Sequence, residues 1–277
     1  MNELTSAIER NVAAALAEDI GSGDWTAQLI APAAAGRAHV VSRNDGVICG
    51  APWFDACFRR LDPKVDIQWA VREGDRIRSG QQLATVRGAA RALLTGERAA
   101  LNFLQMLSAV ATATRRYVDA VAGTATTIVD TRKTLPGLRL AQKYAVLAGG
   151  GANHRIGLYD AILIKENHIA AAGGIAQVLR AAARIAPPGV WTQIEVENFG
   201  QLREALDAGA KMILLDNMST EEMREAVKIA AGRAELEASG GITLDDVRAV
   251  AETGVDRISI GSLTKDIKAL DLSMRFD

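Results

Sequence analysis

The sequence predicts an α/β protein in which a compact α+β unit is followed by an incomplete TIM-like α/β barrel. Between residues 36 and 91, short β-rich runs are separated by Gly, Asp and Pro, which is typical of a small α+β unit. After residue 121, about six strand patterns each lead through Gly, Asn or Ser into a helical pattern. Such an alternation indicates parallel strands joined by helical crossovers.

The elements before the barrel can be located from their hydrophobic spacing. Leu4, Ile8, Val12 and Leu16 recur at helical spacing, and this first helix should end before residues 21–26, where glycines and a capping-type Asp interrupt the pattern. The β-rich runs that follow read RAHVVSR, GVICG, VDIQWAV and QQLATV. The next, Ala- and Leu-rich helix is expected over residues 96–121.

Six strand candidates define the expected barrel. They lie at residues 126–130, 161–164, 192–197, 212–216, 234–239 and 257–260. Polar residues occur at the C-terminal end of nearly every one, whereas an open sheet concentrates its ligands at one switch point. We therefore expect a barrel, with fewer than eight strands, and a site where its strands end.

Composition excludes several classes of function. The chain has 277 residues, a formal net charge of −1, a mean hydropathy of +0.07 and no apolar run near the ~20 residues that a membrane helix needs. A pI of about 6.3 and 4% aromatic residues argue against a nucleic-acid partner. Cys49 and Cys57 are too few for a disulfide framework, and the N-terminus lacks the features of a secretory signal, so a cytoplasmic location is expected.

The residues after the expected strands change in character along the barrel. Cationic residues follow the early strands, whereas carboxylates and then glycines follow the later strands. In strand order these residues are Arg132, Lys133, Lys165, Glu195, Glu197, Asp216, Ser239-Gly240-Gly241 and Gly261-Ser262, with His154 and Arg155 in the segment between the first two strands. Cations on an almost neutral chain suit a small ligand with several negative charges.

Each group has a distinct chemical use. Arginine presents a planar fork of donors and lysine a compact charge, so the cations could hold a ligand with two carboxylates. The carboxylates of Glu195 and Asp216 could accept sugar hydroxyls or hold Mg²⁺ together with substrate phosphates. The glycine segments allow backbone N–H groups to approach phosphate oxygens.

Other interpretations of these residues remain open. Lys165 or Lys133 could be the amine of a Schiff-base lyase or aldolase, which would need a lowered lysine pKa. The chain could also bind phosphorylated metabolites without catalysis. Individually, a Gly-Gly pair can be a simple turn, Glu197 can form a structural ion pair, and His154 can be a satisfied imidazole near a site.

Several long segments resemble the quinolinate phosphoribosyltransferases, the carboxylating nicotinate-nucleotide pyrophosphorylases, over nearly the whole chain. The segments are EDIGSGDWT (18–26), GERAALNFLQMLS (96–108), DTRKTLPGLR (130–139), KYAVLAGGGANHRIGLYDAILIKENHI (143–169), IEVEN (194–198), LLDNM (214–218), EASGGIT (237–243) and ISIGSLT (258–264). A molybdenum-linked pyrophosphorylase homologue of the same fold is the alternative, but the complete TRK and NHR segments favour quinolinate.

The resemblance implies a domain organisation and an assembly. An N-terminal α/β sandwich domain would span residues 1–100 and be joined by the C-terminal tail 266–277, and a barrel domain would span 101–265. The protein would be a homodimer, with possible further assembly, in which the N-terminal region of one subunit covers the barrel mouth of the other.

The resemblance also implies a reaction and its residues. Quinolinate and 5-phosphoribosyl-1-pyrophosphate (PRPP) would give nicotinate mononucleotide, pyrophosphate and CO₂ in NAD biosynthesis, with Mg²⁺ bound through PRPP and no organic cofactor. Lys133, Glu195 and Asp216 would be catalytic, with Glu195 favoured over Glu197 as the carboxylate that contacts the ribose or Mg²⁺-pyrophosphate. The remaining substrate-binding residues would be Thr131, Arg132, His154, Arg155 and Lys165 near quinolinate, Arg98 from the partner, and Ser239, Gly240, Gly241, Ile260, Gly261 and Ser262 near the 5-phosphate. The sequence leaves open whether His154 contacts substrate.

Overall fold

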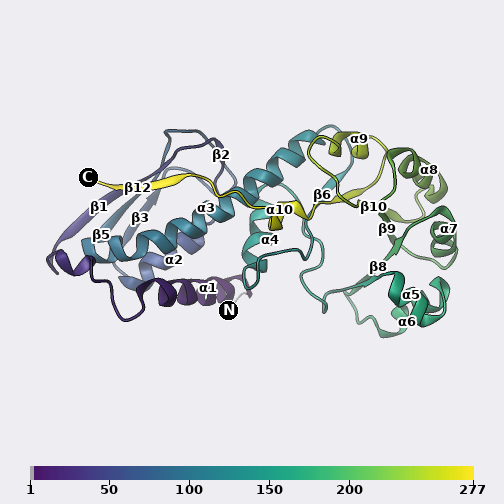
Figure 1. Ribbon diagram of the computed structural model, residues 1–277, viewed down its shortest axis with the longest axis horizontal. Helices are drawn as coiled ribbons and strands as arrows, with labels where there is room; N and C mark the ends of the chain where they lie inside the picture. Colours follow the sequence, from purple (N-terminus) through teal and green to yellow (C-terminus); the bar gives the residue numbers. More distant parts are fainter. Residues whose placement is uncertain (1–2) are drawn as a thin grey trace. The chain divides into compact units, whose positions relative to one another are not determined.

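The structure is a computed structural model that describes residues 3–277 and divides the chain into two compact units (Figure 1). The N-terminal unit comprises Met1–Arg115, Thr134–Gly150 and Leu263–Asp277. The barrel unit comprises Arg116–Lys133 and Gly151–Ser262. Among the described residues, no helix is both long enough and apolar enough to cross a membrane.

The N-terminal unit contains an antiparallel four-stranded sheet in the order β12-β1-β5-β3. The strands are β1 (Ala35–Ser42), β3 (Asp66–Trp69), β5 (Gln82–Ala89) and β12 (Leu272–Phe276). The last strand returns to pair with β1, as in the register Val40↔Met274. A separate two-stranded ladder joins β2 (Gly46–Val47) and β4 (Arg76–Ile77).

Helices complete this unit. They are α1 (Glu3–Ile20), the short 3₁₀ helix η1 (Ala27–Leu29), α2 (Ala51–Leu61), the N-terminal part of α3 (Ala90–Ala120), α4 (Arg139–Ala148) and most of α10 (Ser262–Lys265). Trp53, Phe54 and Phe58 of α2 are fully buried in the core of this unit. An antiparallel sheet with packed helices confirms the α/β layers expected for the N-terminal domain.

The N-terminal unit extends past residue 100, the boundary expected from the sequence. Leu101, Leu104 and Leu107 of α3 are buried in its core, together with Ala145 and Val146 of α4. Burial of apolar surface holds these segments in the unit, since each buried aliphatic side chain contributes about 1.5–3 kcal/mol.

The barrel unit contains six parallel strands in the order β6-β11-β10-β9-β8-β7. The strands are β6 (Thr127–Val129), β7 (Ala161–Ile164), β8 (Trp191–Val196), β9 (Met212–Asp216), β10 (Glu235–Ser239) and β11 (Arg257–Ser259). β6 and β7 form the two edges of this sheet and do not pair with each other. The arrangement confirms the expected incomplete barrel, because a closed barrel has no edge strands.

Helices follow the strands of the barrel unit along the chain and line their outer side (Figure 1). They are α5 (Glu166–Ala172), α6 (Ile175–Ile185), α7 (Phe199–Asp207), α8 (Thr220–Ala230) and α9 (Val247–Ala251). Asn198 caps the N-terminus of α7, because its side chain accepts a hydrogen bond from the backbone N–H of Gln201. A capping box of Ser219 and Glu222 precedes and opens α8. Such caps satisfy backbone donors at the first turn and fix where each strand-end loop stops.

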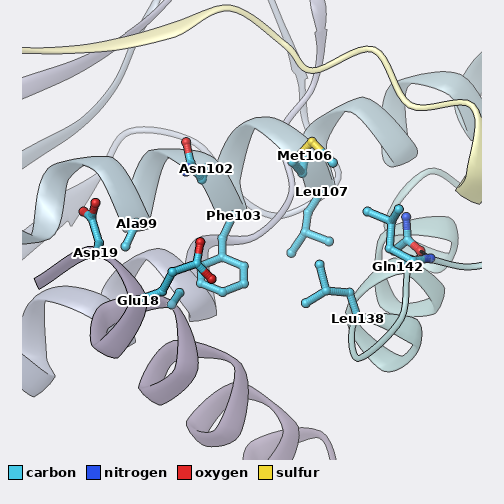
Figure 2. Close-up of a pocket in the computed structure, with 11 residues that line it drawn as sticks. Glu18, Asp19, Ala99, Asn102, Phe103, Met106, Leu107, Leu138 and Gln142 are labelled. Carbon is cyan, nitrogen blue, oxygen red and sulfur yellow. Dashed lines mark hydrogen bonds between the residues drawn. The ribbon is translucent and has the colours of Figure 1, made fainter. Parts of the chain in front are cut away.

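A pocket lies in the N-terminal unit, between α1, α3 and the segment that leads into α4 (Figure 2). Phe103, Leu107 and Leu138 form its apolar wall, and Glu18 and Asp19 line one end. No Lys or Arg lines this pocket, and it contains none of the expected site residues. It therefore does not suit a multiply negative substrate.

Candidate active site

The first cations of the candidate site follow β6 in the barrel unit. Residues after Gly150 run beside this strand, because Val129 and Ala152 form a parallel bridge. The buried carboxylate of Asp130 accepts hydrogen bonds from the backbone N–H of His154 at 2.9 Å and from Nδ2 of Asn153 at 2.6 Å. Asp130 thus ties the Asn-His-Arg segment to the segment that carries Arg132.

The guanidinium groups of Arg132 and Arg155 lie close enough to affect each other. Burial lowers the pKa of Arg155, the positive charge of Arg132 lowers it further, and Asp160 partly opposes both effects. Nη1 of Arg155 also donates to the carbonyl of Ala161 at 3.3 Å. Two like charges in a partly desolvated position repel each other, and an anion bound between them would relieve this repulsion.

Lys165 and Glu195 form an ion pair at the ends of β7 and β8. Nζ of Lys165 lies 2.8 Å from Oε2 of Glu195, and the lysine is 46% exposed whereas the glutamate is 11% exposed. The exposed Lys165 end can therefore rotate toward a ligand. The backbone N–H of Lys165 donates to Nδ1 of His168 at 3.0 Å, which is a helix-capping contact at the start of α5.

The two glutamates of β8 and its following loop differ in environment. Glu195 is half-buried and ion-paired, whereas Glu197 is exposed, and its backbone N–H donates to Oε1 of Gln201. The expectation that Glu195 rather than Glu197 contacts substrate fits this difference.

A polar cluster lies where β9 and β10 end. Asp216 and Ser239 are paired in register, and the backbone N–H of Asn217 donates to the carbonyl of Ser239 at 3.0 Å. Nδ2 of Asn217 donates to Oδ2 of Asp216 at 2.8 Å. Gly240 has a φ of +113°, and a Cβ at this position would overlap Oδ1 of Asn217 and lie 3.0 Å from its Cα. Glycine is therefore required for the loop to pass this close to Asn217.

The β11 end lies beside the β6 end. Ser259 is in register with Val129, and the N–H of Ile260 donates to the Val129 carbonyl at 2.9 Å. A Cβ at Gly261 would lie 3.1 Å from Cδ of Lys133 and 3.8 Å from Oγ1 of Thr131. The expected phosphate loop therefore leaves room for the Lys133 side chain.

Almost all of the expected site residues belong to the barrel unit. They comprise Thr131, Arg132, Lys133, His154, Arg155, Lys165, Glu195, Asp216, Ser239, Gly240, Gly241, Ile260, Gly261 and Ser262. Arg98 is an exposed residue of α3 in the N-terminal unit, so its role at the site stays a prediction.

The sequence reasoning missed two buried polar residues below the strand ends. Gln193 and Glu237 are each 1% exposed and are linked by a hydrogen bond of 3.1 Å from Nε2 to Oε2. Each lies two positions before an expected site residue, Glu195 and Ser239 respectively, so strand alternation gives all four the same orientation. A search for polar residues at that spacing would have found them.

Comparisons with known proteins identify the family. The C-terminal domain model of quinolinate phosphoribosyl transferase matches residues 110–275, and the N-terminal domain model matches residues 24–108. The chain is 45% identical to a probable carboxylating nicotinate-nucleotide pyrophosphorylase of Bacillus subtilis over 93% of this chain and 89% of that one. It is 38% identical to decarboxylating quinolinate phosphoribosyltransferase 1 of Nicotiana glauca, over 95% and 80% of the two chains.

A solved structure is similar along the whole chain. The nicotinate-nucleotide pyrophosphorylase of Francisella tularensis superposes with a TM-score of 0.96 at 42% identity and covers 100% of both chains. The chain therefore belongs to the quinolinate phosphoribosyltransferase family.

Proposed function

We propose that the strand-end residues of the barrel unit carry out the reaction of this family. The activity is that of a decarboxylating quinolinate phosphoribosyltransferase of NAD biosynthesis. The observation that carries the assignment of the site is the placement of Arg132 and Arg155. Asp130 links the two segments that carry them, and their like charges lie close enough to repel each other. A dianionic pyridine would relieve this repulsion and would account for the neighbouring cations.

Quinolinate has two adjacent carboxylates, and the early strands supply the cations for both. Arg132 and Arg155 can each present two parallel donors to a carboxylate, and Lys133 and Lys165 add compact charges. The Lys165 ammonium already forms an ion pair with Glu195, which neutralises its positive charge in the absence of substrate. On binding, Lys165 would be shared between Glu195 and a quinolinate carboxylate.

The later strands would bind PRPP. Asp216 and Glu195 would accept hydrogen bonds from ribose hydroxyls, while backbone N–H groups of the Ser239–Gly241 and Gly261–Ser262 segments would hold the 5-phosphate. The exposed glycines of the first segment allow a phosphate to approach the backbone. These groups would hold the sugar next to the pyridine nitrogen.

Mg²⁺ fits this donor set as an ion carried mainly by substrate. Among residues 3–277, no three His, Cys, Asp or Glu side chains are grouped to hold a metal. Two carboxylates, Glu195 and Asp216, stand at the ends of neighbouring strands, and Mg²⁺ is commonly held by one or two carboxylates together with substrate phosphates. When bound with pyrophosphate, it would supply positive charge that stabilises the leaving group.

The protein's contribution to the chemistry is orientation and charge. Departure of pyrophosphate makes C1 of the ribose cation-like, and the pyridine nitrogen must lie in line with it. Lys133, beside Gly261, would stabilise the negative charge that develops on the departing pyrophosphate. After transfer, Arg132 and Arg155 would orient the 2-carboxylate. As CO₂ leaves, the electron pair of the broken C–C bond would stay on C2 of the positively charged ring, and a proton from water would then bind there to complete nicotinate mononucleotide.

The alternatives are less consistent with these contacts. A Schiff-base enzyme needs a neutral lysine in a desolvated position. Lys165 is exposed and ion-paired, and Lys133 is exposed. Borohydride in the presence of substrate should therefore leave no covalent adduct on the protein.

The test of the function is pyrophosphate release by the purified protein. With PRPP and Mg²⁺, release is expected on addition of quinolinate, with an equal amount of CO₂, and only at background level with nicotinate, which lacks the 2-carboxylate. Binding of both substrates without release of pyrophosphate would instead indicate a non-catalytic binding protein.

The expected homodimer is part of this proposal. Arg98 is exposed on α3 and would complete the quinolinate site of a second subunit. The expected cytoplasmic location also stays a prediction.

A further inference from the structure

Three polar side chains form a hydrogen-bonded chain inside the barrel unit. Nε2 of His154 lies 2.8 Å from Oε1 of Gln193, and Nε2 of Gln193 lies 3.1 Å from Oε2 of Glu237. His154 is 7% exposed, and the other two are 1% exposed. Oε1 of Glu237 has no hydrogen-bond partner among the described residues. Burying such groups is costly, so a gain in stability alone does not explain them.

The donors and acceptors of this chain fit together in one way. The backbone N–H of Arg155 donates to Nδ1 of His154 at 2.8 Å, so Nδ1 must carry a lone pair. The neutral ring then has its proton on Nε2 and donates it to Oε1 of Gln193, whose Nε2 donates to Glu237. If the Gln193 amide were turned over, its NH₂ group would face the Nε2–H of His154 and its oxygen would face the Glu237 carboxylate. If the ring were an imidazolium, its Nδ1–H would face the backbone N–H of Arg155.

The His154 ring is held on its other sides as well. Its backbone N–H donates to Asp130, and its ring packs edge-on against Trp191 with centroids 5.0 Å apart. With Nε2–H directed at Gln193 and Nδ1 directed at the Arg155 amide, the ring has no proton to donate to a substrate carboxylate. Its contact with the Arg155 amide does fix the backbone from which the Arg155 guanidinium extends.

We propose that His154 positions Arg155 instead of binding quinolinate, and that Gln193 and Glu237 are positioning residues that hold its ring in the neutral Nε2–H form. The inference rests on the proposed function, because that function assigns Arg155 to the quinolinate site. It gives the buried Gln193 and Glu237 a role in substrate affinity although neither contacts substrate.

The direct test is the protonation state of the ring in the wild-type protein. The chain has three histidines, so long-range ¹H–¹⁵N spectra of histidine-labelled protein can be assigned with a His154→Asn variant. The His154 signals should be those of the neutral Nε2–H tautomer, both without ligand and with saturating quinolinate. An imidazolium, the Nδ1–H tautomer, or a new hydrogen bond from Nε2–H on quinolinate addition would overturn the proposal.

Kinetics provide a second test. Gln193→Leu removes the central link and should raise KM for quinolinate about tenfold, with kcat and KM for PRPP near wild type. Glu237→Leu should have the same effect, and the double variant should be no worse than either single one, because both ends of the broken bond are then apolar. An unchanged KM for quinolinate in folded Gln193→Leu would also overturn the proposal.

Two further variants separate position from general stability. Glu237→Gln keeps an acceptor oxygen for Gln193 and should keep KM for quinolinate within about threefold of wild type. Glu235→Gln on the same strand, where the residue is exposed, should behave as wild type. The spectra need no turnover, so they remain informative even if wild-type protein releases no pyrophosphate, which would refute the proposed function by itself.

Discussion

A single methyl group at Gly240 should disrupt the proposed PRPP end of the site. The residue has a φ of +113°, which L-residues rarely adopt, and a strained backbone of this kind costs about 1–3 kcal/mol. The new Cβ would also overlap Oδ1 of Asn217 and press on its Cα at 3.0 Å, and overpacking adds about 1–3 kcal/mol. Gly240→Ala should therefore lower the free energy of unfolding by about 3 kcal/mol.

The same overlap links stability to substrate binding. Asn217 can move only by giving up its bond to Asp216 or its backbone bond to Ser239. We therefore expect KM for PRPP to rise at least tenfold in Gly240→Ala, measured by pyrophosphate release, with stability measured by urea unfolding.

Gly232→Ala is the matched control. Gly232 has a φ of +75° in the same unit, but a Cβ there meets no atom within 4 Å. It should cost only about 1 kcal/mol and leave KM for PRPP unchanged. If Gly240→Ala is no less stable than Gly232→Ala and binds PRPP normally, the close approach of Gly240 to Asn217 does not shape the site.

Three further predictions test other parts of the account. Lys133→Ala should lower kcat/KM at least tenfold, or about 1.4 kcal/mol, and wild-type kinetics would remove Lys133 from the site. Mixing inactive Arg98→Ala with inactive Lys165→Ala should restore part of the activity through hybrid dimers, and no recovery despite proven subunit exchange would contradict a shared site. The Ala27 N–H and the Thr95 hydroxyl lower the pKa of the Asp24 carboxyl, so its contribution to stability is present above the ordinary aspartate pKa and is lost as pH falls through the lowered value. Asp24→Asn should therefore lower Tm at pH 7 and approach wild type in acid, whereas an equal loss at every pH would contradict this linkage.

The barrel strands were predictable because each is a short apolar run bounded by turn-forming or polar residues. The expected strands at 161–164 and 212–216 match β7 and β9 residue for residue. The start of α3 was wrong by six residues, since Gly96 was interpreted as a boundary although the helix begins at Ala90. A Cβ at Gly96 would lie 2.9 Å from Cδ1 of Phe58, so this glycine allows α3 to pack closely against α2.

For the candidate site, only the positions of the residues at the strand ends could be predicted from the sequence. Charged residues that directly follow a strand must lie near its C-terminal end, so Lys165 and Asp216 could be placed from position alone. The two-residue spacing from Glu195 and Ser239 gives the strand face on which Gln193 and Glu237 lie, but their contact with each other could not be predicted before the strand order was known. The contact between Nδ1 of His154 and the Arg155 amide joins neighbouring residues, but the sequence does not show the ring orientation on which it depends.

Calorimetric titration of quinolinate tests the central claim that cations from separate strand ends form one dianion site. Wild-type protein should bind quinolinate, Arg155→Gln should bind it at least tenfold more weakly, and Arg184→Gln should bind it as wild type does. Arg184 is the matched control because it is an exposed arginine in the last turn of α6. Equal quinolinate affinity in wild type and folded Arg155→Gln would contradict the account.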